Sequence, residues 1–139
     1  MLLVDTNVVL DVVQDDPRWA GWSRAQLDAL SLQYDLIVNP VIYAELSIAF
    51  ARIEELEAVI AKGGLRVEPI PREALFLAGK VFLKYRKSGG AKTGVLPDFF
   101  IGAHAAVAGI PLLTRDTKRY GTYYPGVELL SPGAAEALR

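Results

Sequence analysis

The chain has 139 residues, of which 52% are hydrophobic and 22% are charged, and its formal net charge is -1. This composition is typical of a folded globular protein, and the length suits a single domain spanning residues 1–139. Because cysteine is absent, a disulfide scaffold and a zinc site with thiolate ligands are excluded. No basic segment leads into an apolar one as in a signal peptide, and no apolar run approaches the roughly 20 residues of a membrane span. We therefore expect a cytoplasmic protein with no membrane partner.

Strands and helices are expected to alternate along the first half of the chain. The apolar periodicity predicts, in order, a strand over 2–4, a helix ending at residue 13, a helix over 23–34, a strand over 36–38, and helices over 40–52 and 53–61. Thr6 or Asn7 would cap the first of these helices. Pro17 interrupts the helical pattern, whereas Pro40 suits the first turn of a new helix.

The second half continues the alternation around a long polar loop. The pattern predicts, in order, a strand over 66–70, a helix opened by Pro71, a glycine-rich loop over 87–97, a helix over 98–108, and strands over 112–114 and 127–130. Pro69 would push its strand toward a sheet edge. On the helix after Pro71, the side expected to be buried carries Leu75, Ala78, Phe82 and Tyr85. The whole alternation predicts an α/β fold with a mainly parallel sheet of about five strands and helices on both faces.

Four acidic residues follow or lie close to the ends of these elements. Asp5 comes directly after the first strand, and Glu45 lies in the helix after the second strand. Asp98 starts a helix, and Asp116 lies two residues beyond Thr114 at the end of the fourth strand. Because ligands of open α/β sheets bind beyond the carboxyl ends of the strands, all four acids are expected at one edge of the sheet.

Each acid also has a purely structural interpretation. Asp5 and Asp98 would both serve as helix caps, and Asp116 is an ordinary residue for a turn. Glu45 is harder to explain in this way, because its neighbours in the sequence are nearly all apolar and a buried carboxylate needs a partner or a metal. The joint occurrence of four such acids favours a site over four unrelated structural roles.

Four clustered carboxylates predict a bound cation. They cannot all stay ionised unless some are protonated or positive charge lies among them. Oxygen ligands without histidine or thiolate favour Mg²⁺ or Mn²⁺. Such an ion activates water and neutralises charge on a phosphodiester, so phosphodiester hydrolysis is the predicted chemistry.

Basic residues near the acids predict an anionic polymer as the substrate. Arg115, Lys118 and Arg119 flank Asp116 and are the candidate RNA-binding residues. A basic rim would hold the flanking phosphates while the acidic pocket acts on the scissile one. An ordinary solvated loop explains any single one of these residues equally well.

Four motifs resemble those of a known family. The segments "LLVDTNVVLD", "PVIYAELSIAF", "PDFFIGAHAAVAG" and "LLTRDTKRYGTYYPGVELL" are similar in order and spacing to those of PIN-domain ribonucleases, above all the VapC-type toxins of prokaryotic toxin–antitoxin pairs. The resemblance covers essentially the whole chain and implies a three-layer α/β/α fold.

The resemblance also implies roles for individual residues and partners. By this likeness, Asp5, Glu45, Asp98 and Asp116 are the catalytic acids around Mg²⁺ or Mn²⁺, and Asp5 and Asp98 are its direct ligands. Asn7 and Thr114 match the polar accessory positions of the family. The resemblance further implies a cognate antitoxin and a homodimer. The apolar segment 45–60 could line a groove for a partner peptide, although core packing explains most of its side chains.

Three other classes of function remain open from the sequence. A haloacid-dehalogenase-like phosphotransferase also has an Asp after its first strand, but it needs a second Asp where this chain has Asn7. A receiver-type signalling module also clusters acids at a sheet edge, but it needs an Asp after the third strand, where "RVEPIPRE" offers only glutamates. A non-enzymatic interaction domain would show no metal-dependent cleavage. Metal-dependent RNA cleavage is the activity that separates the leading interpretation from all three.

Overall fold

A sheet of five short strands forms the centre of the molecule, whose computed structural model describes residues 1–92 and 94–133. The strands are β1 (Leu2–Val4), β2 (Leu36–Val38), β3 (Arg66–Val67), β4 (Leu112–Leu113) and β5 (Leu129–Leu130). Their order in the sheet is β3-β2-β1-β4-β5, and every neighbouring pair is parallel. The prediction of a mainly parallel five-stranded sheet is confirmed.

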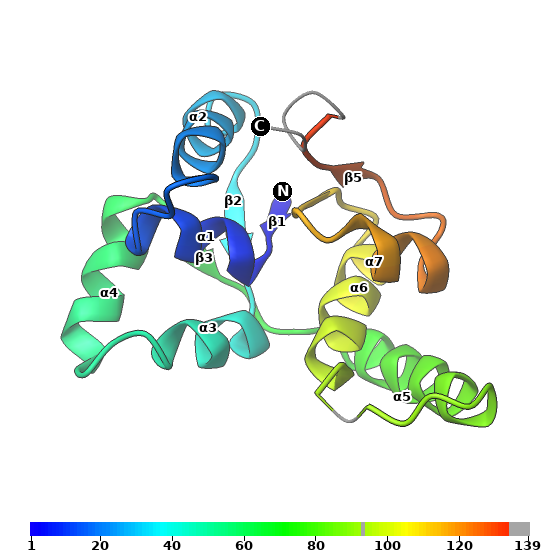
Figure 1. Cartoon of the computed structure of the whole chain (residues 1–139). Coiled ribbons are helices and arrows are strands. Elements are labelled where there is room, and N and C mark those ends of the chain that lie inside the picture. The colour runs from blue at the N-terminus through cyan, green and yellow to red at the C-terminus, as the bar shows by residue number, and fades with distance from the viewer. Residues whose placement is uncertain (93, 134–139) are drawn as a thin grey trace.

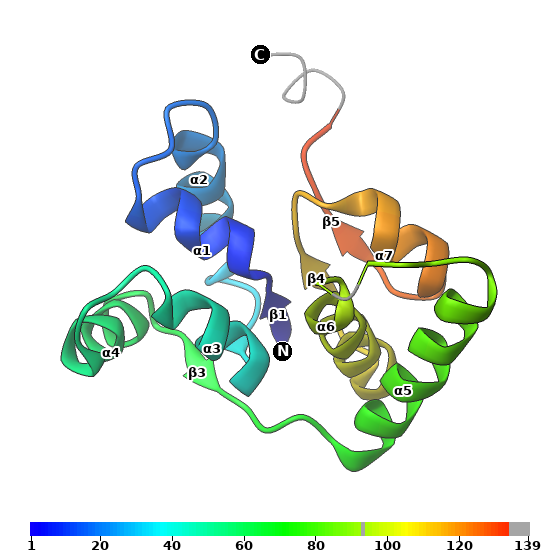
Figure 2. The ribbon, with the colours of Figure 1, turned by 60° about the horizontal axis from the view of Figure 1, so that its bottom comes forward.

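Seven helices connect the strands in the described part of the chain. They are α1 (Thr6–Val13), α2 (Ala20–Leu30), α3 (Pro40–Ser47), α4 (Ile53–Lys62), α5 (Arg72–Lys87), α6 (Leu96–Ala108) and α7 (Thr117–Tyr123). Figures 1 and 2 show α1, α2 and α4 on one side of the strands and α5, α6 and α7 on the other. Helix α3 contacts both α1 and α6. The arrangement is the predicted three-layer α/β/α fold.

The strand order explains why the helices divide in this way. From β1 the chain moves outward to β2 and then to the edge strand β3, and the helices of these connections cover one face. It then returns past β1 to β4 and β5, so the later helices cover the other face. The direction of strand order therefore reverses between β1 and β4, which is the position where open α/β sheets bind ligands.

The central strands are apolar because both faces of the sheet are covered. All three residues of β1 and both residues of β4 are fully buried. Parallel strands covered on both faces carry near-continuous apolar runs rather than an alternating pattern. The run around Asp5 therefore continues from a buried strand into the buried side of α1, where Val8 and Val9 lie.

Local signals fix several helix ends. Asp5 is the N-cap of α1, and its carboxylate accepts a hydrogen bond from the Thr6 amide at 2.8 Å. Asn39 caps α3 in the same manner, ahead of Pro40 in the first turn. Gly109 ends α6 in the left-handed conformation, with φ of 66°, which glycine adopts without strain.

Several predicted boundaries and orientations are wrong. The helix expected over 40–52 ends at Ser47, and α7 was not predicted. Leu75, which was expected on the buried side of its helix, is 44% exposed. Helical periodicity identifies an apolar face, but it does not reveal whether another element packs against that face.

None of the helices in the described ranges combines the length and the apolar character needed to cross a lipid bilayer.

Candidate active site

The carboxyl ends of β1 and β4 hold the centre of the candidate site. Asp5 follows β1 directly, and Thr114 follows β4. Asp98 lies in the first turn of α6, and Asp116 lies at the N-cap position of α7 without capping it through its side chain. Glu45 reaches the site from α3. These elements are far apart in the sequence, and the reversal of strand order brings them to one edge.

Asp5 is buried, with only 4% of its surface exposed. Its oxygens accept hydrogen bonds from the Thr6 amide at 2.8 Å, the Thr114 hydroxyl at 2.7 Å and the Tyr120 hydroxyl at 3.2 Å. All these donors are neutral. Burial therefore outweighs them and raises the pKa of Asp5 to about 6.

Glu45 is connected to the same centre through Thr6. The Thr6 hydroxyl donates to Glu45 Oε1 at 2.6 Å, while the Thr6 amide donates to Asp5. Partial burial raises the pKa of Glu45, and the negative charge of Asp98 adds to the increase. The two acids thus share one residue as a hydrogen-bonding bridge.

Asp98 and Asp116 share the guanidinium of Arg119. Arg119 Nη1 forms an ion pair with Asp98 Oδ2 and lies 3.7 Å from Asp116 Oδ2. Burial still raises the pKa of Asp98, since the lowering by Arg119 does not offset desolvation and the nearby Asp116 adds repulsion. Arg119, which was predicted to bind RNA, is thus paired with two of the acids in this structure.

Tyr120 links the pair Asp5 and Glu45 to the pair Asp98 and Asp116 through its hydroxyl group. Sequence reasoning missed this role. The Tyr120 hydroxyl lies 3.2 Å from Asp5 Oδ2 and 3.4 Å from Asp98 Oδ1, and the side chain is almost fully buried. Burial and the adjacent carboxylates raise its pKa well above the ordinary value. The phenol therefore stays protonated and serves as a donor.

The predicted accessory residues lie beside Asp5. Thr114 is fully buried, donates to Asp5 and accepts a hydrogen bond from the Asp116 amide at 3.0 Å. The Asn7 amide group lies 3.4 Å from both Asp5 Oδ2 and the Thr114 hydroxyl oxygen. Asn7 and Thr114 thus support the position of the Asp5 carboxylate.

Arg115 occupies a different environment from the other basic candidates. Its guanidinium binds Asp11 through two hydrogen bonds of 2.8 and 2.9 Å and lies over the ring of Trp19. Lys118 is exposed on α7. RNA contact by either residue remains a prediction, and Arg115 would have to make it while holding Asp11.

A model of the PIN domain family matches residues 2–122. The chain belongs to the PIN domain family. This membership favours the nuclease interpretation of the sequence motifs over the haloacid-dehalogenase-like alternative. A comparison with curated proteins gives no match.

Several solved structures share the fold of this PIN domain. VapBC2 from Rickettsia felis, bound to a promoter DNA fragment, matches with a TM-score of 0.73 at 16% identity, covering 95% of this chain and 98% of the other. FitAcB from Neisseria gonorrhoeae matches with a TM-score of 0.72 at 22% identity and the same coverage. A toxin–antitoxin complex from Klebsiella pneumoniae matches with a TM-score of 0.65 at 20% identity, covering 96% and 98%. At these identities the matches establish the fold.

The PIN-domain acids suit a hard divalent cation by their chemistry. Within the described residues, no group of three or more acidic or histidine side chains is placed so that it could hold a metal ion. The donors present are nevertheless all carboxylate oxygens, and burial raises the pKa of Asp5, Glu45 and Asp98. Arg119 pairs with Asp98 and Asp116, whereas the hydrogen bonds to Asp5 and Glu45 come from neutral donors. A donor set made of carboxylate oxygens alone fits Mg²⁺ or Mn²⁺.

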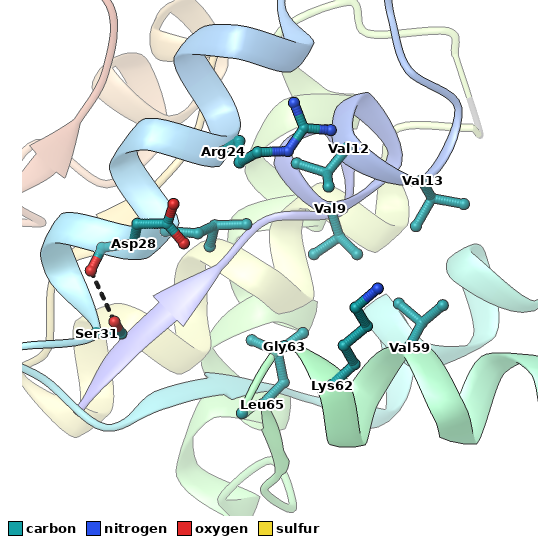
Figure 3. Close-up of a pocket in the computed structure, with 12 residues that line it drawn as sticks. Val9, Val12, Val13, Arg24, Asp28, Ser31, Val59, Lys62, Gly63 and Leu65 are labelled. Atoms are coloured by element: carbon teal, nitrogen blue, oxygen red, sulfur yellow. Dashed lines mark hydrogen bonds between the residues drawn. The ribbon is translucent and has the colours of Figure 1, made fainter.

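A separate groove lies on the other side of this PIN domain. Its volume is about 690 Å³. Figure 3 shows side chains that line it from three helices: Val9, Val12 and Val13 on α1, Arg24 and Asp28 on α2, and Val59 and Lys62 on α4. The segment 45–60, which was expected to line a partner groove, contributes only Val59. Helix α1 supplies three of the apolar side chains that line this groove, Val9, Val12 and Val13.

Proposed function

We propose that this PIN domain is an endoribonuclease that depends on Mg²⁺ or Mn²⁺ and acts as the toxin of a toxin–antitoxin pair. The observation that carries the proposal is that shared partners link four acids where strand order reverses: Thr6 links Glu45 to Asp5, Tyr120 links Asp5 to Asp98, and Arg119 links Asp98 to Asp116. Asp5 is buried among neutral donors alone. The family supports nuclease chemistry, and the basic residues around Asp116 support an anionic polymer as substrate.

Each side chain has a defined task in this mechanism. Asp5 and Asp98 would hold the ion directly, and Glu45 and Asp116 would complete its surroundings. When bound, the ion neutralises charge on the phosphodiester and lowers the pKa of a water molecule. Tyr120 keeps Asp5 and Asp98 at a fixed separation through its hydroxyl. Arg119, relieved of its role beside Asp98, would be available to a phosphate of the RNA.

The activity is tested with paired substrates and one matched variant. Single-stranded RNA and DNA of the same sequence are incubated with the protein in Mg²⁺, in Mn²⁺ and in excess chelator. We expect cleavage of the RNA only, and only with metal. Asp98→Asn should reduce cleavage by about 100-fold or more, because ion binding supplies several kcal/mol of charge stabilisation. The exposed Asp28→Asn should cleave like the parent, and robust cleavage in chelator would refute the metal mechanism.

The partner proposed for the groove between α1, α2 and α4 is the antitoxin. The structural neighbours include a toxin–antitoxin complex, and the apolar surface of α1 suits an amphipathic helix. The proposal predicts a short reading frame next to the gene of this chain, and the probe is its product, co-expressed with this chain. It should co-purify with the parent and with Val107→Asp on α6, but not with Val12→Asp. A complex that survives Val12→Asp would place the antitoxin elsewhere.

The homodimer is proposed to form through α5. Leu75, Phe76 and Leu83 are 44%, 69% and 47% exposed on this helix, which is an unusual amount of apolar surface for a solvated face. Light scattering should give twice the 15.1 kDa chain mass for the parent. Phe76→Glu should give the monomer mass, while Leu32→Glu, at an even more exposed apolar position outside α5, should not change it. A monomeric parent would refute the proposal.

A further inference from the structure

A second pocket opens directly beside the acidic site. It has a volume of about 570 Å³ and lies between the loop 89–92, the start of α6 and helix α7. Asp116 and Arg119, which belong to the acidic cluster, also line this pocket. A volume of this size lies within the range of small-molecule sites in proteins. Any chain bound at the acidic site has this pocket as its immediate neighbour.

Two tyrosines form an aromatic wall of the pocket. Tyr123 comes from α7 and Tyr85 from α5, and their ring centroids are 6.0 Å apart at an interplanar angle of 82°. Phe99 braces Tyr123 from the buried side, with the two rings 5.1 Å apart at 87°. Because packing holds Tyr123 from behind and leaves it partly exposed, the ring offers a fixed surface for stacking.

The loop that closes the pocket is held against Tyr85. The Lys92 amide donates to the Tyr85 hydroxyl at 3.1 Å. Gly90 lies so close to the Tyr85 ring that a Cβ at this position would come within 2.4 Å of it. Tyr85 therefore positions the loop, and any larger residue at position 90 would displace it. Because the loop occupies Tyr85, Tyr123 is the tyrosine of this wall that is available to stack on a base.

Positive charge surrounds the aromatic wall. Lys92, Lys118 and Arg119 line the pocket, against a single acid, Asp116. Within the described residues, Lys92 and Lys118 form no ion pair with a carboxylate. Free ammonium groups beside a fixed aromatic ring are the combination with which proteins bind single-stranded nucleic acid. An acidic peptide would satisfy the lysines but not the ring.

We propose that this pocket binds the nucleotide adjoining the scissile phosphate, with the base against Tyr123 and its phosphate near Lys92 and Lys118. The inference rests on the proposed ribonuclease function, to which it adds a specific subsite. A polynucleotide held at the acidic cluster must continue past Asp116, and the pocket begins there. The subsite fixes the register of the RNA, so it determines which bond is cleaved.

Binding is tested without catalysis, in excess chelator. The probe is a set of four ribonucleoside 3′,5′-bisphosphates, and ribose bisphosphate without a base and inorganic phosphate are the comparison ligands. Calorimetry should show the nucleotides binding at least about fivefold more tightly than the two ligands without a base, because stacking contributes that much or more. Lys118→Gln and Tyr123→Leu should each weaken nucleotide binding, whereas Lys62→Gln in the remote groove should not. Gly90→Ala should weaken it too, and Gly79→Ala, which adds a Cβ in open space on α5, should not.

Cleavage of long RNA provides the second readout. Lys118→Gln should raise KM more than it lowers kcat, because the acidic cluster is unchanged. If the parent cleaves RNA but nucleotide binding is insensitive to Lys118→Gln, Tyr123→Leu and Gly90→Ala, the subsite is wrong and the proposed function stands. If nucleotides bind as expected but no RNA is cleaved with metal, the proposed function is wrong and the pocket remains a nucleotide site. Equal binding of inorganic phosphate and nucleotides would overturn the role of Tyr123.

Discussion

Asp5 and Asp11 are two buried aspartates at opposite ends of the first helical segment, and they are stabilised differently. Asp11, 3% exposed, binds the Arg115 guanidinium through both oxygens and accepts a hydrogen bond from the Ser23 hydroxyl at 2.7 Å. Asp5, 4% exposed, has only neutral donors. Burial of a carboxylate therefore does not identify a functional acid. Asp5 differs in having no cation among its hydrogen-bond partners, which is what we expect of a buried acid that a metal ion would bind.

The largest expected change in stability comes from replacing Asp11, the aspartate that is paired with Arg115. Asp11→Asn leaves the Arg115 charge without its partner, while the shape of the side chain is retained. We expect the free energy of unfolding to fall by about 2–4 kcal/mol, since removing one partner of a largely buried ion pair is strongly destabilising. Urea denaturation measures this change. A loss below about 0.5 kcal/mol, the scale of an ordinary surface substitution, would show that the pair is not a structural anchor.

Asp5, the aspartate without a cationic partner, should make the stability of the metal-free protein depend on pH. Because the pKa of Asp5 is raised from 3.8 to about 6, the folded protein binds its proton more tightly than the unfolded chain does. The favourable contribution is complete below about pH 4 and is lost as the pH rises to about 6, by roughly 3 kcal/mol in total. The measurement is the difference in stability between the parent and Asp5→Asn, taken in chelator from pH 4 to 7. A constant difference across this range would contradict the assignment.

At pH 7 the same substitution should stabilise the metal-free protein. The asparagine that Asp5→Asn introduces would still cap α1, and the substitution would remove a poorly compensated charge. We expect Asp5→Asn to raise the free energy of unfolding by about 1–2 kcal/mol in chelator, as substitutions at functional sites often do. Excess Mg²⁺ should reverse the order, because ion binding stabilises the parent more than the variant. A less stable Asp5→Asn in chelator would mean that Asp5 is chiefly a helix cap.

The sequence predicts where the acids lie relative to the strands, but it does not predict which side chains contact them. Asp5 and Asp116 follow short apolar runs, and parallel topology brings such positions to one edge, so the acidic cluster could be anticipated. The α/β fold class was predicted from the alternation of strand and helix patterns along the chain. The role of Tyr120 could not be predicted, because it depends on its distance to an aspartate 115 residues earlier in the chain. The bond between Arg115 and Asp11 was missed for the same reason.

Element ends were predicted well only where the sequence contains a local signal. Gly109 ended its helix as expected, since a residue that adopts positive φ is a strong stop. The end of α3 at Ser47 has no glycine or proline to mark it, and the apolar residues continue beyond it. Helix α7 contains Gly121 and two threonines in only seven residues, so its helical pattern was too weak to detect.

The smallest expected effects compare two hydroxyl donors. Ser23→Ala removes one donor from Asp11, which keeps its arginine, and should cost about 0.5–1 kcal/mol of stability. Tyr120→Phe removes a donor shared by Asp5 and Asp98 and should cost more, about 1–2 kcal/mol, because Asp5 has no cation to offset the loss. Urea denaturation of both variants at pH 7 in chelator gives the comparison. Equal losses of stability in the two variants would mean that the Arg115 cation beside Asp11 does not change the stabilisation that a hydroxyl donor provides.

Calorimetric titration of Mn²⁺ into the parent, Asp5→Asn and Asp28→Asn tests most directly whether the unpaired buried acid is part of a metal site. Asp28 is an exposed aspartate on α2 and controls for the general loss of one negative charge. We predict that the parent and Asp28→Asn bind Mn²⁺ with the same affinity and that Asp5→Asn binds about tenfold or more weakly, since even residues that only support metal ligands have effects of this size. Equal Mn²⁺ affinity in the parent and Asp5→Asn, or no binding by the parent, would contradict the metal site.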